Sequence, residues 1–166
     1  GGGRVQCALC PRSCLVEDGG RGECGVRENR GGVYYTLVHS RPCALNVDPI
    51  EKKPLFHYRP GTNAFSLATA GCNLHCRFCQ NWEISQSLPE EVESSNVTPE
   101  EIVKRARESG ARSIAFTYSE PTVFYEYARD ICEAARGSGL GCVMISNGYI
   151  QDRPQRELLP LLDAIK

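Results

Sequence analysis

Three cysteines on one short loop are the strongest constraint on how this chain folds. They are spaced C-x3-C-x2-C, at Cys72, Cys76 and Cys79, and they come directly after the apolar run 65–69. Three thiolates on one loop suit an iron–sulfur cube, because each sulfur can ligate a different corner iron. A four-iron cube held by three cysteines keeps one iron without a protein ligand, and that iron can bind a small molecule.

This triplet could also be part of a zinc site or a set of unrelated core cysteines. Structural zinc sites take four ligands, usually as two short cysteine pairs, whereas this loop offers three in a row. Buried structural cysteines are common, but they rarely fall on this spacing beside an aromatic residue such as Phe78. We therefore interpret the triplet as the ligand set of an iron–sulfur cluster.

Length and composition exclude several classes of protein. The 166 residues suit one ordinary domain, and the net charge of -1 offers no case for nucleic-acid binding. No apolar stretch approaches the length of a membrane span. Ten cysteines would suggest disulfides in a secreted protein, but their clustering at metal-like spacings favours a reducing compartment. We expect a cytoplasmic protein without nucleic-acid or membrane partners.

From residue 65 onward the pattern alternates between strands and helices. Thr98 is the predicted N-cap of a helix, with Pro99 at its first position, Glu101 three residues after the cap and a stop near Gly110. Further strands are predicted at 113–116 and 142–145, helices at about 121–137 and 155–159, and a fourth strand from about residue 162. This alternation indicates right-handed parallel βαβ units in an α/β fold.

The end of the chain falls inside the expected fourth strand, at residues 163–166. A parallel sheet that ends on a half-formed strand is unfinished. We therefore expect this chain to be the front half of a longer protein, the alternative being a complete domain that ends on an edge strand.

The first 60 or so residues differ from the rest in composition. They are rich in Gly, Cys and Arg, with short extended runs at 33–38 and 44–47, and prolines punctuate the segment that follows. We predict a Cys-rich metal-binding segment over residues 1–61 and the amino-terminal half of a barrel over residues 62–166.

Three polar segments directly follow the predicted strands. Cys72 follows the first strand, residues 117–122 follow the second, and residues 146–149 follow the third. In barrels and open parallel sheets, chemistry sits beyond the carboxyl ends of the strands. We therefore expect the three segments to share one site.

The cysteine spacing, with Phe78 just before the third cysteine, resembles the signature of the radical S-adenosylmethionine (SAM) superfamily. The resemblance implies a partial (βα)6 barrel that binds a 4Fe-4S cluster and SAM. It also implies that the amino and carboxylate groups of SAM chelate the open iron. An electron from the reduced cluster, supplied by a donor such as ferredoxin or flavodoxin, would then cleave SAM to methionine and a 5′-deoxyadenosyl radical.

Two further segments resemble SAM-binding motifs of that superfamily. Residues 118–121 look like its Gly-Gly-Glu-Pro motif with both glycines replaced, which would place Ser119 and Glu120 at the methionine ammonium. The alternative for Glu120 is an acid that stabilises a helix N-terminus. Residues 146–148 resemble a Thr-Asn-Gly loop, which would place Asn147 and Gly148 near the ribose and methionine, although Asn-Gly alone also marks a turn. No catalytic residue is predicted beyond the cluster, and His75 is expected to pack or hydrogen-bond.

A second cysteine set lies near the amino terminus, at Cys7, Cys10, Cys14 and Cys24. Glycines between the last two permit tight turns that bring four sulfurs together. Four thiolates fit either a closed zinc site or a fully ligated iron–sulfur cluster, and the alternative is four free or paired cysteines. Of the remaining cysteines, Cys43 lies apart and could join either group, whereas Cys132 and Cys142 look like core residues.

The blocks 7–14, 22–27, 49–57 and 79–82 together narrow the resemblance. They look like the radical SAM member of the AmmeMemoRadiSam system, a relative of pyruvate formate-lyase activating enzymes. This implies an activating-enzyme-like oxidoreductase with possible Memo-like and AMMECR-like partners. Activating enzymes abstract hydrogen from a glycine of a partner protein. Action on a small molecule or peptide, and a non-catalytic iron–sulfur or zinc module, remain as alternatives.

Overall fold

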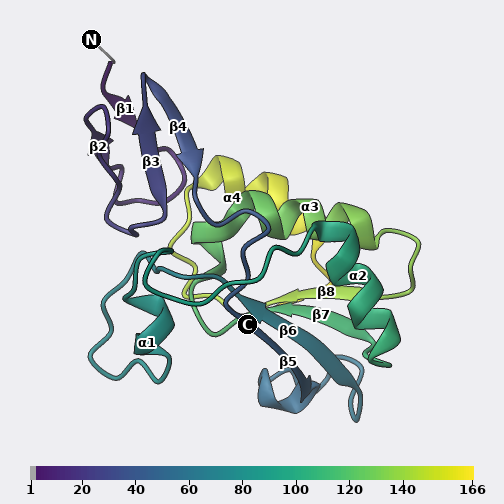
Figure 1. The fold of residues 1–166 in the computed structure, drawn as a ribbon. Helices are drawn as coiled ribbons and strands as arrows, with labels where there is room; N and C mark the ends of the chain where they lie inside the picture. Colours follow the sequence, from purple (N-terminus) through teal and green to yellow (C-terminus); the bar gives the residue numbers. More distant parts are fainter. Residues whose placement is uncertain (1–2) are drawn as a thin grey trace.

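A five-stranded sheet is the centre of the computed structural model, which describes residues 3–166. Its order is β5-β6-β7-β8-β9, in which the last four strands are parallel and β5 is antiparallel to β6. The strands are β5 (Ala44–Pro49), β6 (Asn63–Ala68), β7 (Ser113–Phe116), β8 (Gly141–Met144) and β9 (Ala164–Ile165). Sequential parallel strands confirm the predicted α/β alternation (Figure 1).

Strand β5 pairs with β6 over six residues, from Ala44 opposite Ala68 to Pro49 opposite Asn63. The sequence predicts an extended run here but assigns it to the amino-terminal segment. The sheet therefore begins ahead of residue 62, where we predicted the second domain to start. The structure establishes a mixed α/β fold with a five-stranded sheet. The partial (βα)6 barrel stays a prediction.

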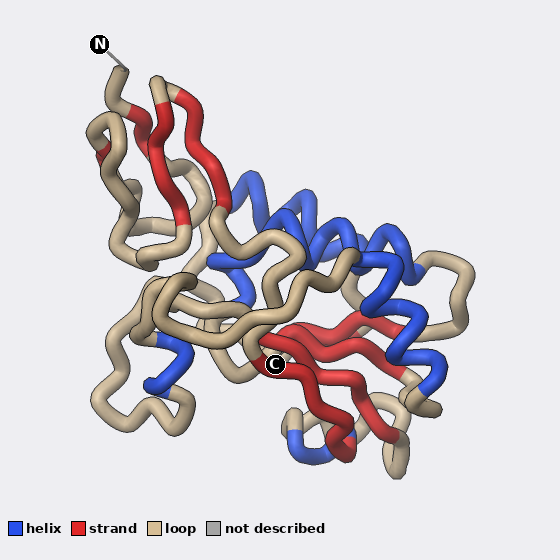
Figure 2. Tube along the Cα trace, viewed as in Figure 1, coloured by secondary structure: helices blue, strands red, loops and turns tan. Residues whose placement is uncertain are grey.

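Helices α2 (Pro99–Glu108), α3 (Tyr125–Ala135) and α4 (Asp152–Leu158) cover one face of this sheet, whereas α1 (Trp82–Ser85) lies apart from it in the region after β6 (Figures 1 and 2). The 3-10 turns are η1 (Ile50–Lys52), η2 (Pro121–Phe124) and η3 (Leu159–Leu161). Thr98 caps α2 as predicted, because its Oγ accepts a hydrogen bond from the Glu101 backbone N–H at 3.3 Å. Residues 69–98 contain no helix or strand other than α1.

The two faces of the sheet carry side chains of different size. Large residues such as Phe116, Leu67 and Met144 pack under the helices, in a core that also contains Cys132 and Cys142, as predicted. The opposite face carries Ala64, Ala115 and Val143. Ile50 is fully buried against these small side chains, so the segment after β5 covers that face of the sheet.

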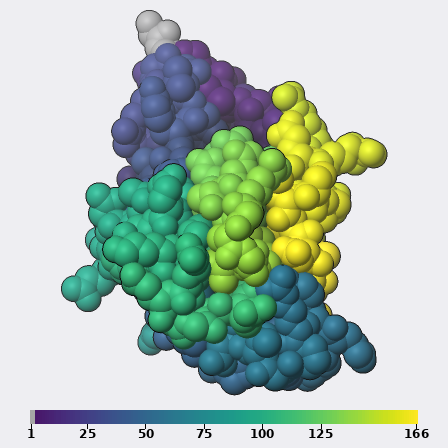
Figure 3. Space-filling view, turned by 90° about the vertical axis from the view of Figure 1, so that its right-hand side faces the viewer, coloured from purple at the N-terminus to yellow at the C-terminus, as the bar shows by residue number. Residues whose placement is uncertain are grey.

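The amino-terminal residues form two small antiparallel sheets at one end of the molecule (Figures 1 and 3). These are β1 (Val5–Gln6) with β2 (Leu15–Val16), and β3 (Arg27–Arg30) with β4 (Val33–Thr36). A buried ion pair attaches them to α3, because both Arg27 terminal nitrogens contact the Glu126 carboxylate, one at 2.8 Å. The segment before α4 also contacts them, since Gln151 donates its backbone N–H to the Leu9 carbonyl at 2.9 Å.

None of the helices formed by residues 3–166 has the length and apolar character that crossing a membrane requires.

Candidate functional site

A cleft of about 670 Å³ lies beyond the carboxyl ends of β6, β7 and β8. The loops after these three strands meet there, as the parallel topology predicts. Among its lining residues are Cys72, Cys79, Asn81, Tyr118, Ser119, Glu120, Ser146 and Asn147. One open site therefore contains residues from all three predicted segments.

The loop with the cysteine triplet is held in place by its neighbours. The Gly71 backbone N–H donates to the Ile84 carbonyl at 2.9 Å, and Asn81 Nδ2 donates to the Tyr118 carbonyl at 3.0 Å. Cys79 Sγ lies 3.3 Å from Ser85 Oγ. These contacts join the loop to α1 on one side and to the end of β7 on the other.

All three thiols of the triplet are unpaired, with Cys76 exposed and the other two half-buried against the cleft. Burial raises the pKa of Cys72, and the backbone N–H groups of Leu74 and Glu120 oppose that rise. The donor set would suit an iron–sulfur cluster held beside the cleft, because Cys72 and Cys79 line the cleft and the cleft has room for a ligand. That these three thiolates ligate the irons of a cluster stays a prediction.

Glu120 joins the loops after β7 and β8. Its Oε1 accepts hydrogen bonds from the Thr122 N–H at 3.0 Å and from the Thr122 and Ser146 hydroxyls, each at 2.7 Å. Its Oε2 accepts from the Asn147 N–H at 2.8 Å. The residue is only 4% exposed. Its carboxylate connects the loops after β7 and β8, which together form the rim of the cleft. Contact with a SAM ammonium stays a prediction for this residue.

The other predicted SAM-binding residues lie around the same rim. Ser119 Oγ donates to the Thr69 carbonyl at 2.8 Å, which ties β7 to the end of β6. Asn147 Oδ1 accepts from the Tyr149 N–H at 2.8 Å, and Gly148 has a φ of 71° that suits glycine. Gly148 borders a small neighbouring cavity instead of the cleft, so its predicted role is indirect in this arrangement.

A buried charge network beside the cleft was not predicted from the sequence. Asp48 accepts hydrogen bonds from Lys53 Nζ at 2.7 Å, from Lys52 Nζ at 3.0 Å and from the Tyr118 hydroxyl. Lys53 is 2% exposed and both lysines and Tyr118 line the cleft. Burial favours the neutral acid, but these donors outweigh it and hold the pKa of Asp48 well below its usual range. Burial and the Asp48 carboxylate raise the pKa of Tyr118 to about 12.

Tyr118 has a φ of 66°, a left-handed conformation that glycine adopts more easily. This is the position where the Gly-Gly-Glu-Pro pattern has a glycine. The bond from its hydroxyl to Asp48 and the Lys53 ammonium 4.4 Å from its ring centroid hold the side chain in place. The adjacent Lys52 and Lys53, four and five residues after Asp48, were the only sequence signal for this network.

The sequence model of the Radical SAM superfamily matches residues 66–165. That range contains the cysteine triplet, Glu120 and Asn147, whose loops form the cleft. The chain belongs to the radical SAM superfamily. Membership supports binding of a 4Fe-4S cluster and of SAM, and it implies a radical SAM type of activity.

Among curated proteins, the chain is similar to the uncharacterized protein MJ0808 of the archaeon Methanocaldococcus jannaschii. The two are 48% identical over 155 residues, which is 93% of this chain and 46% of that protein. The chain thus spans about half the length of this relative. The name of the relative states no substrate.

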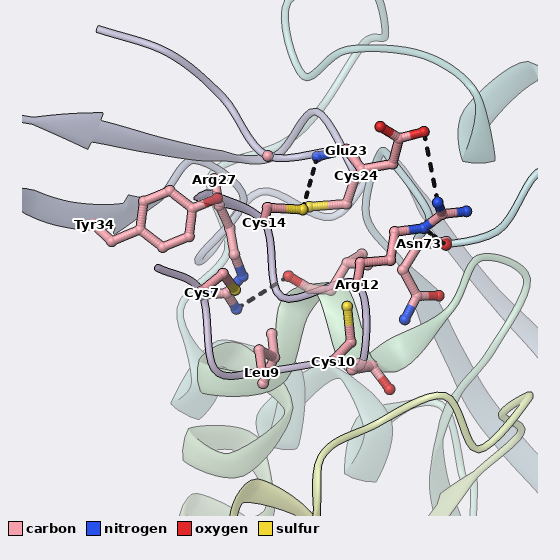
Figure 4. Close-up of a pocket in the computed structure, with 13 residues that line it drawn as sticks. Cys7, Leu9, Cys10, Arg12, Cys14, Glu23, Cys24, Arg27, Tyr34 and Asn73 are labelled. Carbon is pink, nitrogen blue, oxygen red and sulfur yellow. Dashed lines mark hydrogen bonds and ion pairs between the residues drawn. The ribbon is translucent and has the colours of Figure 1, made fainter. Parts of the chain in front are cut away.

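The amino-terminal cysteines lie outside the range of the radical SAM match. Cys7, Cys10, Cys14 and Cys24 line one small cavity of about 20 Å³, together with Arg27 and Tyr34 (Figure 4). Across residues 3–166, no three His, Cys, Asp or Glu side chains stand close enough together to share one metal ion. The structure therefore places the four thiols around one cavity without bringing three of them within reach of one ion, and a metal at this site stays a prediction.

His75 takes part in hydrogen bonds, as expected. Its Nε2 lies 3.0 Å from Glu23 Oε1, and its Nδ1 contacts Gln86. Glu23 precedes Cys24, so His75 links the triplet loop to the amino-terminal cysteine set.

Proposed function

We propose that this chain forms the cluster- and SAM-binding part of a radical SAM enzyme that abstracts hydrogen. The observation that supports this most directly is the single cleft lined by Cys72, Cys79, Glu120 and Asn147. Three thiols from one loop and hydrogen-bonding groups from the next two loops are the combination that a cluster with a chelated cofactor needs.

In this proposal Cys72, Cys76 and Cys79 hold the cluster. When bound, the reduced cluster supplies the electron that cleaves SAM to methionine and a 5′-deoxyadenosyl radical. Ser119, Glu120, Asn147 and Gly148 orient the methionine end and the ribose of SAM, either by direct contact or by fixing the shape of the rim. Lys53 and Tyr118 also line the cleft, where their contacts with Asp48 hold both side chains in place.

The finer assignment is the radical SAM enzyme of the AmmeMemoRadiSam system, related to pyruvate formate-lyase activating enzymes. The cysteine blocks at 7–14 and 22–27 and the segment 49–57 support it. The enzyme would activate a partner protein by forming a glycyl radical, or would act on a small molecule or peptide. Because the chain spans about half of its relative, these proposals concern the whole protein.

Partners and compartment follow from the same chemistry. A ferredoxin or flavodoxin would supply the electron, and Memo-like or AMMECR-like proteins would act together with the enzyme. The ten unpaired cysteines suit a reducing compartment, which we propose is the cytoplasm. A non-catalytic iron–sulfur or zinc module is the less favoured alternative, because an electron carrier would need a fourth protein ligand for its cluster.

Anaerobic reconstitution with iron and sulfide tests the cluster assignment. We expect a reducible cluster spectrum in the parent and its loss after Cys72→Ala, Cys76→Ala or Cys79→Ala. Cys43→Ala is the matched control, since Cys43 is also half-buried but lies outside the cleft. An unchanged spectrum in any of the three variants would remove the assignment. The substrate class is tested separately, by following deuterium transfer from labelled proteins or small molecules into 5′-deoxyadenosine.

A further inference from the structure

The amino-terminal cysteine set packs directly against the loop that carries the triplet. Arg12, between Cys10 and Cys14, donates its Nε–H to the Asn73 carbonyl at 2.7 Å. Gly71 has a φ of 83°, and any Cβ there would overlap Val26 and the carbonyl oxygen of Cys24. With the contact between Glu23 and His75, three separate points join the two cysteine regions.

Asn73 extends this connection to the rim of the cleft. It is 1% exposed, and its Nδ2 donates to the Tyr149 carbonyl at 2.9 Å. Its Oδ1 lies 3.5 Å from Asn147 Nδ2. A displacement of Arg12 would therefore affect both the triplet loop and the loop after β8.

Backbone hydrogen bonds already fix the loop that carries Cys7, Cys10 and Cys14 beside the cavity. The Cys7 N–H donates to the Cys14 carbonyl at 2.9 Å, and the Ser13 N–H donates to the Cys10 carbonyl at 3.1 Å. The Glu23 N–H points at Cys14 Sγ, 3.5 Å away. Amide donors directed at sulfur are suited to thiolates that ligate a metal.

Arg27 provides a second, independent observation at this cavity. Its guanidinium is paired with Glu126, but its Nε is buried without a hydrogen-bond partner among the described residues. The residue is 5% exposed and lines the cavity with the four cysteines (Figure 4). An unpaired buried N–H donor is costly, and a thiolate that carries negative charge would satisfy it.

We propose that Cys7, Cys10, Cys14 and Cys24 bind one thiophilic divalent cation of the zinc type, and that this ion fixes the loop carrying Cys72, Cys76 and Cys79. The cavity of about 20 Å³ has room for one water-sized particle, which suits a single ion. Tetrahedral coordination by four thiolates leaves no open position, so the ion is structural.

Binding requires the sulfur atoms to move closer together, since no three ligand side chains share one ion site within residues 3–166. The proposal requires that rotation about the Cα–Cβ bonds brings the sulfur atoms together while the backbone bonds described above persist. Each thiol releases its proton as it binds the ion. The ion then holds Arg12 and Glu23 in position, because each lies next to or between the ligating cysteines.

This inference rests on the proposed function in one respect, namely that the loop carrying Cys72, Cys76 and Cys79 binds the cluster. Its test needs neither SAM nor a reductant. The full chain with Cys72, Cys76 and Cys79 all replaced by Ala is purified, so that no cluster forms on the triplet. We expect about one zinc per chain and no acid-labile sulfide. Adding Cys7→Ser or Cys10→Ser should reduce the zinc content at least tenfold, whereas adding Cys43→Ser should leave it unchanged.

Hydrogen exchange of the same triple variant, with zinc bound and after chelation, tests the coupling. Zinc removal should accelerate exchange across residues 71–81 at least tenfold and leave α2 unchanged. Iron with sulfide at the amino-terminal cysteines, or no metal with four freely reactive thiols, would overturn the metal assignment. Equal exchange across 71–81 with and without zinc would overturn the coupling. Because SAM cleavage is measured in the parent protein, failure of this inference and failure of the proposed function give different results.

Discussion

The Oε2 atom of Glu120 accepts a hydrogen bond from the backbone N–H of Asn147 at 2.8 Å. This bond connects the loops after β7 and β8 through a carboxylate that also binds Thr122 and Ser146. The two loops therefore form one hydrogen-bonded rim. In a radical SAM enzyme, such a rim can hold a cofactor in a defined orientation only if its own side chains are fixed.

Glu120→Gln should weaken both the rim and the binding of SAM. The amide nitrogen cannot accept hydrogen bonds, so at least one buried donor loses its partner, at a cost of about 1–3 kcal/mol in the free energy of unfolding. We expect a similar loss in SAM affinity with the cluster still formed. Urea unfolding and calorimetric SAM titration measure the two effects. Glu108→Gln, at the exposed end of α2, is the control, and a Glu120→Gln protein that matches it in both measurements would contradict this account.

Asp48→Asn should destabilise the protein at neutral pH by about 3–5 kcal/mol, because it leaves the buried Lys53 ammonium without its partner. The pKa of the Asp48 carboxyl is depressed in the folded protein. Its contribution is therefore complete above the unfolded value of about 3.9 and is lost as the pH falls below that value. The difference in the free energy of unfolding between the parent and Asp48→Asn should therefore become smaller toward pH 3.

Urea unfolding at pH 7, 4 and 3 checks this pH dependence. Asp152→Asn removes an exposed ion pair with Arg156 and should change stability by less than about 1 kcal/mol at every pH. A constant gap between the parent and Asp48→Asn across this range would show that the network does not depend on the charge of Asp48.

Gly71→Ala tests the tight contact between the two cysteine regions. Gly71 and Gly110 both have positive φ, at 83° and 75°, but only Gly71 has neighbours that an added Cβ would overlap. We expect Gly71→Ala to cost about 1–3 kcal/mol more than Gly110→Ala, the range for overpacking a filled interior. Thermal unfolding and iron content after reconstitution are the measurements. Equal destabilisation by the two substitutions would mean that the contact is not tight in solution.

Arg12→Ala should loosen the triplet loop without unfolding the domain. The substitution removes a charged donor from the Asn73 carbonyl, a bond worth about 1.5–3 kcal/mol, so exchange across residues 71–81 should rise about tenfold or more. Arg4→Ala removes an exposed pair with Glu17 and should leave that exchange unchanged. Equal hydrogen exchange across residues 71–81 in the two variants would show that Arg12 does not stabilise the triplet loop.

Local sequence patterns predicted those structural features that depend on residues close together in the chain. The Thr98 cap and the alternation of strands with helices follow from residues close together in the chain, and the parallel arrangement of the strands then brings Cys72, Glu120 and Asn147 to one edge. Contacts between distant segments were not predictable in this way. Asp48 and Tyr118 are 70 residues apart, and Arg27 and Glu126 are 99 apart.

The antiparallel strand β5 shows why the Asp48 network was missed. Its extended run is visible in the sequence, but its pairing with β6 depends on tertiary packing that places Asp48 beside the end of β7. The role of Glu120 was likewise predicted only in part. Its position after a strand suggested a ligand, while its four donors come from Thr122, Ser146 and Asn147 and are visible only in the folded chain.

The most direct test of the central claim is the production of 5′-deoxyadenosine from SAM by the anaerobically reconstituted and reduced protein. We predict formation of 5′-deoxyadenosine and methionine in equal amounts by the parent, and none by the variant with Cys72, Cys76 and Cys79 replaced by Ala. Product formed equally by that variant, or no product from a parent protein that carries its cluster and binds SAM, would contradict the assignment of this cleft as a radical SAM site.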